Sequence, residues 1–182
     1  VAGTIRSGFS NPVDAASVLM KFDTNGNLLW RTVFESTFEG SYTKKILVDN
    51  NDNIYVLGLG MGSNGLVTRV KKFDTSGIPI WTVYESNGIG APINMKLTSD
   101  NALLVVGRGI TGIMNGYLKI SVDGNLIWNK PGITSPTIGD AAGDSLGNTY
   151  IINGENTVSN AGSILEKYDP SGILIWANTN AR

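Results

Sequence analysis

Four tryptophans divide this chain at nearly equal intervals. Trp30, Trp81, Trp128 and Trp176 lie 51, 47 and 48 residues apart, and they close the related phrases KFDTNGNLLW, KKFDTSGIPIW, KISVDGNLIW and KYDPSGILIW. A fixed period of this length, kept in register over several copies, is typical of proteins built from a stack of like structural units. The chain is therefore expected to fold as an array of repeats.

Two further positions share this register. A glycine lies four residues before each tryptophan and a lysine lies nine before it: Gly26, Gly77, Gly124 and Gly172, and Lys21, Lys72, Lys119 and Lys167. Upstream of each phrase, an apolar run ends in glycine at Gly3, Gly58, Gly107 and Gly154. The repeats that follow from these anchors cover approximately residues 1–36, 37–86, 87–132 and 133–182 of a single domain or segment.

The apolar residues alternate with polar ones in short runs rich in Val, Ile, Tyr and Leu, without a helical stripe. One period contains four such runs, at Lys44–Val48, Asn53–Gly58, Thr68–Asp74 and Ile78–Glu85. Four antiparallel strands per repeat are typical of a propeller blade. The sequence thus predicts an all-β fold, a β-propeller of four-stranded blades with about four blades visible. Its first blade is incomplete, since the chain opens in a second strand.

The connections are of two kinds. Short Asp, Asn and Gly turns join first to second strands and third to fourth strands. Longer segments such as LGMGSNG, ENTVSNAG and PGITSPTIG join the others. Because connections in an antiparallel meander alternate between its two ends, we expect the tight turns on one face and the long loops on the opposite face. A binding site is expected on the long-loop face or at a central channel beneath it.

Composition excludes several classes of function. Fourteen Lys and Arg against fifteen Asp and Glu give a formal charge of −1, without the basic patch that nucleic acids need. No apolar stretch is long enough for a membrane span, so membrane insertion is not expected. The chain has no cysteine, and so no thiolate nucleophile or thiolate metal ligand. It also has no histidine, the commonest metal ligand and general base. We expect no cofactor and no metal site.

The segments DNNDNIYVLG and VKKFDTSGIPIW resemble the bacterial β-propeller repeat family of secreted and cell-surface proteins. More distantly, the tryptophan strand after an Asp-x-x-Gly turn is similar to the pyrroloquinoline-quinone-type repeats of quinoproteins and outer-membrane assembly scaffolds. The first resemblance implies an extracellular or cell-surface location, or alternatively a periplasmic one, and an adhesive, binding or structural role, usually within a longer polypeptide. The second implies quinone-dependent dehydrogenation.

The repeated residues are interpreted as structural anchors. A tryptophan that recurs at a fixed distance from a turn is expected to pack between neighbouring blades. A lysine that recurs in a strand is expected to lay its stem on an aromatic ring and to direct its ammonium to a turn carboxylate or carbonyl.

Acidic residues raise the alternatives of catalysis and calcium binding. Glu35 and Glu85 follow Trp30 and Trp81 at the same offset, in the manner of paired glycosidase carboxylates, but their equivalence favours shared ancestry of two blades. Asp49 and Asp52 offer oxygen ligands for calcium in a segment that a plain turn also explains. Loop acids without counterparts in other repeats are Asp14, Asp140 and Glu155.

The function expected from the sequence is a non-enzymatic binding or structural module whose partner, a protein or a glycan, is contacted through the long-loop face. The alternative is a propeller enzyme, either a quinoprotein-like oxidoreductase or a carbohydrate-active enzyme. Large side chains of interface type on the long-loop face form the predicted contact set: Arg6, Phe9, Phe38, Tyr42, Met61, Arg108 and Met114. Self-association or further blades are expected to complete the ring, since an unpaired sheet edge is normally covered.

Overall fold

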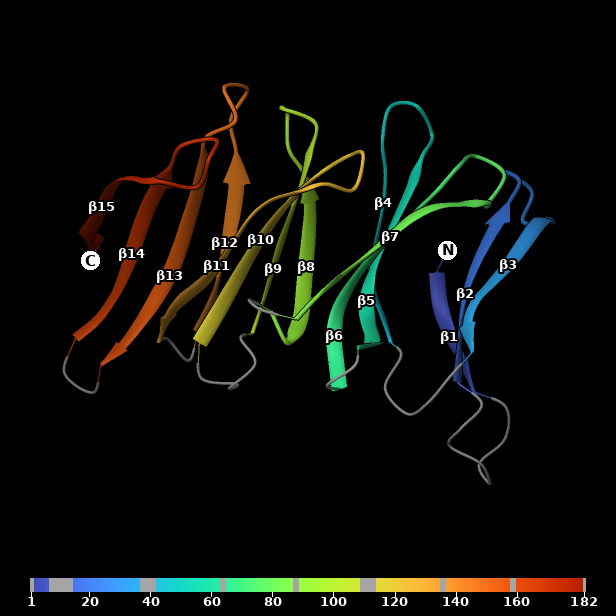
Figure 1. The fold of residues 1–182 in the computed structure, drawn as a ribbon, viewed down its shortest axis with the longest axis horizontal. Coiled ribbons are helices and arrows are strands. Elements are labelled where there is room, and N and C mark those ends of the chain that lie inside the picture. Colours follow the sequence, from blue (N-terminus) through green and yellow to red (C-terminus); the bar gives the residue numbers. More distant parts are fainter. Residues whose placement is uncertain are drawn as a thin grey trace. The chain divides into compact units, whose positions relative to one another are not determined.

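The computed structural model describes residues 2–6, 15–36, 42–62, 65–86, 89–108, 114–134, 137–157 and 160–181. These residues form four antiparallel sheets in which each strand pairs with its sequence neighbour (Figure 1). The first sheet holds β1 (Ala2–Arg6), β2 (Ala15–Phe22) and β3 (Leu28–Ser36). The second holds β4 (Thr43–Val48), β5 (Ile54–Gly62), β6 (Gly65–Phe73) and β7 (Pro79–Glu85).

The third sheet holds β8 (Ala91–Leu97), β9 (Ala102–Arg108), β10 (Met114–Ser121) and β11 (Leu126–Thr134). The fourth holds β12 (Thr137–Gly143), β13 (Thr149–Thr157), β14 (Asn160–Tyr168) and β15 (Leu174–Ala181). In the part of the chain that the structure describes, no helix is long and apolar enough to cross a membrane.

The predicted fold class is confirmed: the chain is all β and its sheets are four-stranded propeller blades, the first of which has three strands. The chain divides into two compact units, Val1–Ser86 and Asn87–Arg182, with two blades in each. Each unit has its own core. The first contains Leu19, Phe34, Ile54, Val56 and Phe73, and the second contains Leu104, Val106, Tyr117, Trp128, Ala141 and Ile151.

All seven short turns in the described residues have one geometry. In the turn 23–27, the Asp23 N–H donates to the Asn27 carbonyl and the Gly26 N–H donates to the Asp23 carbonyl, at 2.9 and 3.1 Å. The fourth residue of each turn is left-handed, as at Gly26 with φ +85°, Asp52 with φ 59° and Asn101 with φ 57°. In each unit these turns lie at one end of the sheets (Figure 1).

The first residue of the turn holds this geometry with its side chain. Asp23 Oδ1 accepts hydrogen bonds from the N–H groups of Asn25 and Asn27, at 2.9 and 2.8 Å. In the third blade Ser121 forms the equivalent hydrogen bonds: its Oγ accepts from the N–H groups of Asp123 and Asn125 at 3.3 and 3.1 Å. An acceptor oxygen is therefore the requirement at this position, and a charge is not.

The sequence predicted long loops at three places where the structure has extended strands and short connections, so these three predictions were wrong. Strands β5 and β6 stay paired to Gly62 opposite Gly65, and β13 and β14 to Thr157 opposite Asn160. Strand β11 runs to Thr134 and β12 starts at Thr137. Glycine, read as a loop signal, serves close packing here: a methyl group added at Gly60 would lie 2.8 Å from Tyr84 Cε1.

One repeat glycine is also out of register. Gly3, Gly58 and Gly107 lie opposite Val18, Arg69 and Gly116, three residues before the repeat lysine in each case. In the fourth sheet this ladder position is taken by Asn153, opposite Ile164, and Gly154 pairs one residue further along with Ser163. The extra residue in YIING shifts its glycine, so the four glycines are not equivalent.

The repeat tryptophan of one blade packs on a turn glycine of the next blade, the glycine that lies four residues before each tryptophan. A methyl group added at Gly77 would lie 2.7 Å from Trp30 Cζ3, and one added at Gly172 would lie 2.8 Å from Trp128 Cγ. Thr32 adds a hydrogen bond from its hydroxyl to the Gly77 carbonyl at 2.8 Å. Only glycine leaves room for the indole at this distance, and it also supplies the left-handed turn residue.

This packing predicts unequal effects of one substitution at two turns. Gly77→Ala and Gly26→Ala both place a side chain at positive φ, which costs about 1–2 kcal/mol. At Gly77 the methyl group also collides with Trp30, whereas nothing lies within 4 Å of one added at Gly26. We expect Gly77→Ala to lower the free energy of unfolding by about 1–3 kcal/mol more than Gly26→Ala, measured by urea denaturation of the single chain in dilute solution. Equal losses would contradict the packing.

The turn aspartates predict part of the acid sensitivity. Hydrogen bonds from the Asn27 and Asn148 side chains hold the pKa of Asp23 and of Asp144 below the usual range. A depressed folded-state pKa stabilises the fold above the unfolded value, about 3.9, and this contribution is lost as pH falls through the folded pKa. Asp23→Ser with Asp144→Ser should therefore lose less thermal stability between neutral and strongly acidic pH than the parent chain. Asp123→Ser, at the third position of its turn, is the matched control and should follow the parent.

Candidate binding groove

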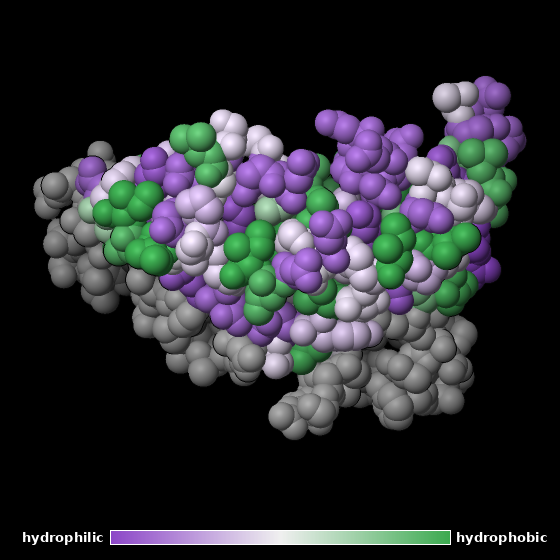
Figure 2. Space-filling model, turned by 45° about the horizontal axis from the view of Figure 1, so that its top comes forward, coloured by the Kyte–Doolittle hydropathy of each residue, from purple (hydrophilic) through white to green (hydrophobic). Residues whose placement is uncertain are grey.

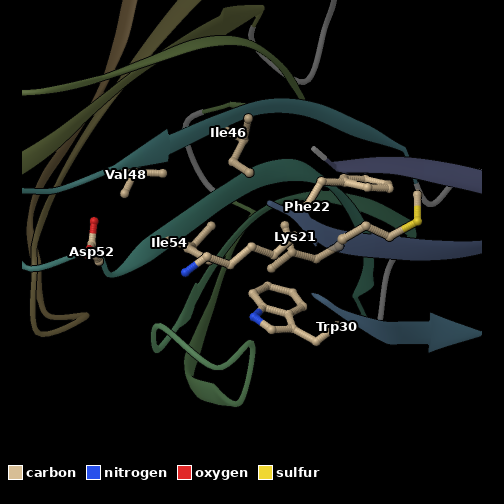
Figure 3. A pocket seen from close by; sticks show the side chains of 9 residues that line it. Lys21, Phe22, Trp30, Ile46, Val48, Asp52 and Ile54 are labelled. Atoms are coloured by element: carbon tan, nitrogen blue, oxygen red, sulfur yellow. The ribbon is translucent and has the colours of Figure 1, made fainter. Parts of the chain in front are cut away.

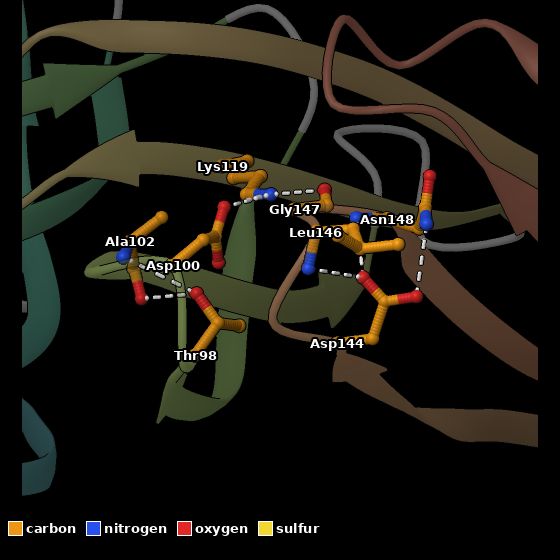
Figure 4. A network of polar contacts seen from close by, with 8 residues as sticks. All are labelled: Thr98, Asp100, Ala102, Lys119, Asp144, Leu146, Gly147 and Asn148. Carbon is orange, nitrogen blue, oxygen red and sulfur yellow. Dashed lines mark hydrogen bonds and ion pairs between the residues drawn. The ribbon is translucent and has the colours of Figure 1, made fainter.

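The repeat lysine of the third blade lies where that blade meets the fourth, and its ammonium group is fully paired (Figure 4). Lys119, on β10, is 1% exposed. Its Nζ lies 2.8 Å from Asp100 Oδ2, in a turn of the same blade, and donates to the Gly147 carbonyl of the next blade at 2.7 Å. Partial burial acts to raise the pKa of Asp100, but hydrogen bonds from Lys119 and Thr98 and the ammonium charge bring this pKa below its usual value. The buried lysine is thus paired with an ionised carboxylate.

The turn that offers the Gly147 carbonyl is held by Asp144. Its Oδ1 accepts from the N–H groups of Leu146 and Asn148 at 3.0 and 2.9 Å, and its Oδ2 accepts from the Asn148 side chain at 2.9 Å and the Tyr150 hydroxyl at 3.2 Å. Beneath the lysine, Tyr117 is 2% exposed and donates its hydroxyl hydrogen to the Asn153 side chain. The boundary between the third and fourth blades is closed.

The equivalent place in the first unit is open. There a groove of about 290 Å³ lies between the first and second blades (Figure 3). Lys21 extends across it with its nitrogen toward the end where Asp52 lies, and Trp30 forms a wall (Figure 3). The full lining is Leu19, Met20, Lys21, Phe22, Trp30, Ile46, Val48, Asp52 and Ile54.

Two differences explain why this groove stays open. Leu19 occupies the ladder position of Tyr117, so a smaller side chain fills less of the boundary. Lys119 forms an ion pair with Asp100, but among the residues that the structure describes no carboxylate occupies the equivalent place beside Lys21. Lys21 is exposed. The same repeat position therefore gives a buried ion pair in the third blade and an accessible ammonium in the first.

The groove combines three kinds of group. Its walls are mostly aliphatic, the indole of Trp30 is half-buried, and an ammonium and a carboxylate lie at its open side. The indole is held in place by Gly77 and cannot turn away without losing that contact. A site of this composition favours a small ligand with an apolar face and an anionic group.

The other repeat anchors lie as follows. Lys72 and Lys167 place their ammonium groups 5.4 and 5.1 Å from the ring centroids of Tyr55 and Tyr150. A hydrogen bond with Tyr150 raises the pKa of Lys167. Trp81 lies 6.0 Å from Tyr55 and Trp176 lies 6.3 Å from Tyr150, measured between ring centroids.

The predicted contact set lies largely beyond what the structure describes. Phe9 and Phe38 are outside the described residues, and so are the side chains of Arg6, Met61 and Met114, whose backbones end β1, lie in β5 and begin β10. Tyr42 and Arg108 are described and exposed. Tyr42 also ties its segment to β5, because its carbonyl accepts from Leu59 N at 2.8 Å. The proposed long-loop site thus stays a prediction.

The acids considered for chemistry have structural surroundings where they are described. Asp140 lies in β12 and Glu155 lies in β13, so the assignment of both residues to loops was wrong. Asp140 forms an ion pair with Lys96 of β8. The hydrogen bond from Lys96 holds the pKa of Asp140 below its usual range. Glu85 is buried in the first unit. Asp14 and the side chains of Glu35 and Glu155 lie outside the described residues.

Asp49 is occupied by its own turn. Its carboxylate accepts from Asn51 N, Asn53 N, the Asn53 side chain and the Tyr55 hydroxyl, each at 2.9 Å. Within the described ranges, no group of three or more Asp, Glu, His or Cys is placed to hold a metal ion.

Sequence reasoning missed Arg69, a fully buried cation in the first unit. It lies opposite Gly58, with Nη2 3.4 Å from Ser17 Oγ and Cζ 5.2 Å from the Phe34 ring centroid. A methyl group added at Gly58 would lie 2.9 Å from Nη2, so glycine makes room for the guanidinium. An alignment of the repeats could have revealed Arg69, because the equivalent residues of the other blades are uncharged: Val18, Gly116 and Ile164.

Comparison with known proteins gives a fold and no family. No family model matches the chain, and no curated protein matches it. The β-propeller domain of the Trilobed protease from Pyrococcus furiosus is similar at 8% identity and a TM-score of 0.53, over 80% of this chain and 45% of that one. A eukaryotic initiation factor structure is similar at 10% identity and a TM-score of 0.53, over 98% of this chain and 52% of that one. The chain spans about half the length of these structures, and the likeness identifies its fold as that of β-propeller blades.

Proposed function

We propose that this chain is a non-enzymatic binding module of a secreted or cell-surface bacterial protein, and that its groove at Lys21 binds an acidic glycan. The observation that carries the proposal is the contrast between Lys21 and Lys119. One repeat lysine is buried against a carboxylate, and its equivalent is exposed beside an indole in a groove of about 290 Å³.

The carboxylates support a binding role over acid–base chemistry. Asp100 and Asp140 are paired with lysines, and Asp49 and Asp144 hold their turns through several hydrogen bonds each. For all four, the pKa lies below the usual range. A general acid needs the opposite shift, toward the working pH.

The groove suits one acidic sugar ring. Its volume lies near the lower end of the range for small-molecule sites, roughly 300–1,000 Å³. The apolar face of a sugar fits against the wall that Trp30 forms, while a sugar carboxylate pairs with the Lys21 ammonium. Asp52, on the same rim, disfavours a second anionic group and so selects for a single carboxylate.

A protein partner on the long-loop end remains part of the proposal. Arg108 and Tyr42 are exposed there, and both are residue types enriched at interfaces. The secreted or surface location rests on the repeat resemblance of DNNDNIYVLG and VKKFDTSGIPIW.

A glycan array containing uronic acid, sialic acid and neutral glycans tests the groove. We expect the parent chain to bind a subset of acidic glycans, and Lys21→Gln to lose at least tenfold in affinity for them because the ammonium is gone. Lys72→Gln removes an equivalent repeat lysine that does not line the groove and is the matched control, expected to bind like the parent. Trp30 is left unchanged because it also holds the Gly77 turn.

Two outcomes would contradict the groove as the binding site. One is equal binding of acidic and neutral glycans, and the other is equal binding by the parent and Lys21→Gln. Loss of glycan binding in Arg108→Ala, with full binding in Lys21→Gln, would instead move the site to the long-loop end.

A further inference from the structure

One face of the fourth blade is built for contact with another blade and is uncovered. Tyr150, Lys167 and Trp176 lie opposite one another on β13, β14 and β15, and Ile152 and Leu165 follow two residues along on the same face. We call these five residues the Trp176 face. A groove of about 220 Å³ on this blade is lined by Tyr150, Ile152 and Leu165 with Asp140, Ala141 and Ala142.

The corresponding face of the third blade shows what this surface looks like when covered. Trp128 is 7% exposed and Val106 is 4% exposed, because the fourth blade packs on them. Their equivalents on the Trp176 face, Trp176 and Ile152, are 40% and 42% exposed. Figure 2 shows an apolar patch at the left, over the C-terminal sheet. Leu174, two residues before Trp176 on β15, is exposed as well. An apolar surface of this kind marks an interaction site.

The opposite half of the same contact is uncovered on the first blade. Gly77 and Gly172 each lie under a tryptophan, but nothing lies within 4 Å of a methyl group added at Gly26, which has the same left-handed conformation. The neighbouring aromatic position agrees: Phe73 is fully buried, with its ring centroid 4.9 Å from that of Phe34, whereas its equivalent Phe22 is 41% exposed. We call residues 22–27 the Gly26 turn.

We propose that two copies of this chain associate head to tail, with Trp176 of one copy packed on Gly26 of the other. The molecule contains the contact twice already, as Trp30 on Gly77 and Trp128 on Gly172. A second copy is the occupant that fits, since it carries a turn of the same sequence pattern with its glycine open. Two copies supply eight blades, the upper end of the usual range of about four to eight.

One such contact joins two different surfaces, the Trp176 face of one copy and the Gly26 turn of the other. Each copy offers one Trp176 face and one Gly26 turn, and in the proposed pair both are used, so that its two contacts are related by a two-fold axis. Lys21 takes no part in this contact, although Phe22 of the Gly26 turn also lines the groove at Lys21.

Two variants break opposite halves of the contact. Trp176→Ala removes the indole. Gly26→Asn places a side chain under it and keeps the turn, because Asp52 and Asn101 show that Asp and Asn adopt the left-handed conformation in this fold. Circular dichroism and thermal melting establish that both variants are folded before they are compared. If Trp176→Ala fails to fold, Ile152→Lys replaces it on the same face.

Sedimentation equilibrium of the parent chain should give twice the 19.4 kDa of one copy. Each variant alone should give a single copy, and a mixture of the two variants should give a one-to-one pair, because one intact Trp176 meets one intact Gly26. A parent chain of 19.4 kDa at every concentration tested would overturn the proposal. So would variants that still pair, or a mixture that stays at the mass of one copy.

Discussion

An indole resting on a glycine joins one blade to the next, and the rest of each unit is arranged around this contact. The glycine meets two demands at once, a left-handed turn and a surface without a side chain, so the third-to-fourth turn and the blade boundary are fixed by the same residue. A side-chain oxygen of the first turn residue, Asp23, Asp74, Ser121 or Asp169, accepts a hydrogen bond from a backbone N–H and so stabilises the turn. Local turn chemistry and long-range packing therefore depend on one short phrase, which explains why that phrase recurs with so little change.

The proposed function rests on positions where one repeat differs from the others. Lys119 and Lys21 hold the same position, but Asp100 and Tyr117 close the boundary around the first, while Leu19 leaves the second in a groove. At one ladder position of the third blade, both the second and the third strand have glycine. The second blade has Arg69 at this position of its third strand, and the fourth blade has Asn153 at this position of its second strand. Each departure is balanced within the fold, by small residues around Arg69 and by the Tyr117 hydroxyl at Asn153. The exposed lysine is the departure most open to a ligand.

The sequence was enough to predict the sheets because period-2 patterns and Asx-Gly turns are local signals. It predicted the four blades, their incomplete first member and the seven short turns, and these agree with the structure. It failed where a glycine serves packing instead of a loop, as at Gly60, and where one inserted residue shifts the register, as at Gly154. The groove could not be foreseen, because Lys21 and Lys119 look alike in the repeats and differ only through side chains that other strands bring near them.

The most direct test of the central contact compares two tryptophans from the same repeat position. In dilute solution, urea denaturation should show that Trp128→Ala lowers the free energy of unfolding by about 3–5 kcal/mol, as expected for a buried aromatic residue. Trp176→Ala should cost less than half as much, since 40% of its surface is exposed and no glycine turn is seen beneath it within the described residues. Equal losses at the two positions would contradict the claim that the indole stabilises the fold through the glycine of the next blade.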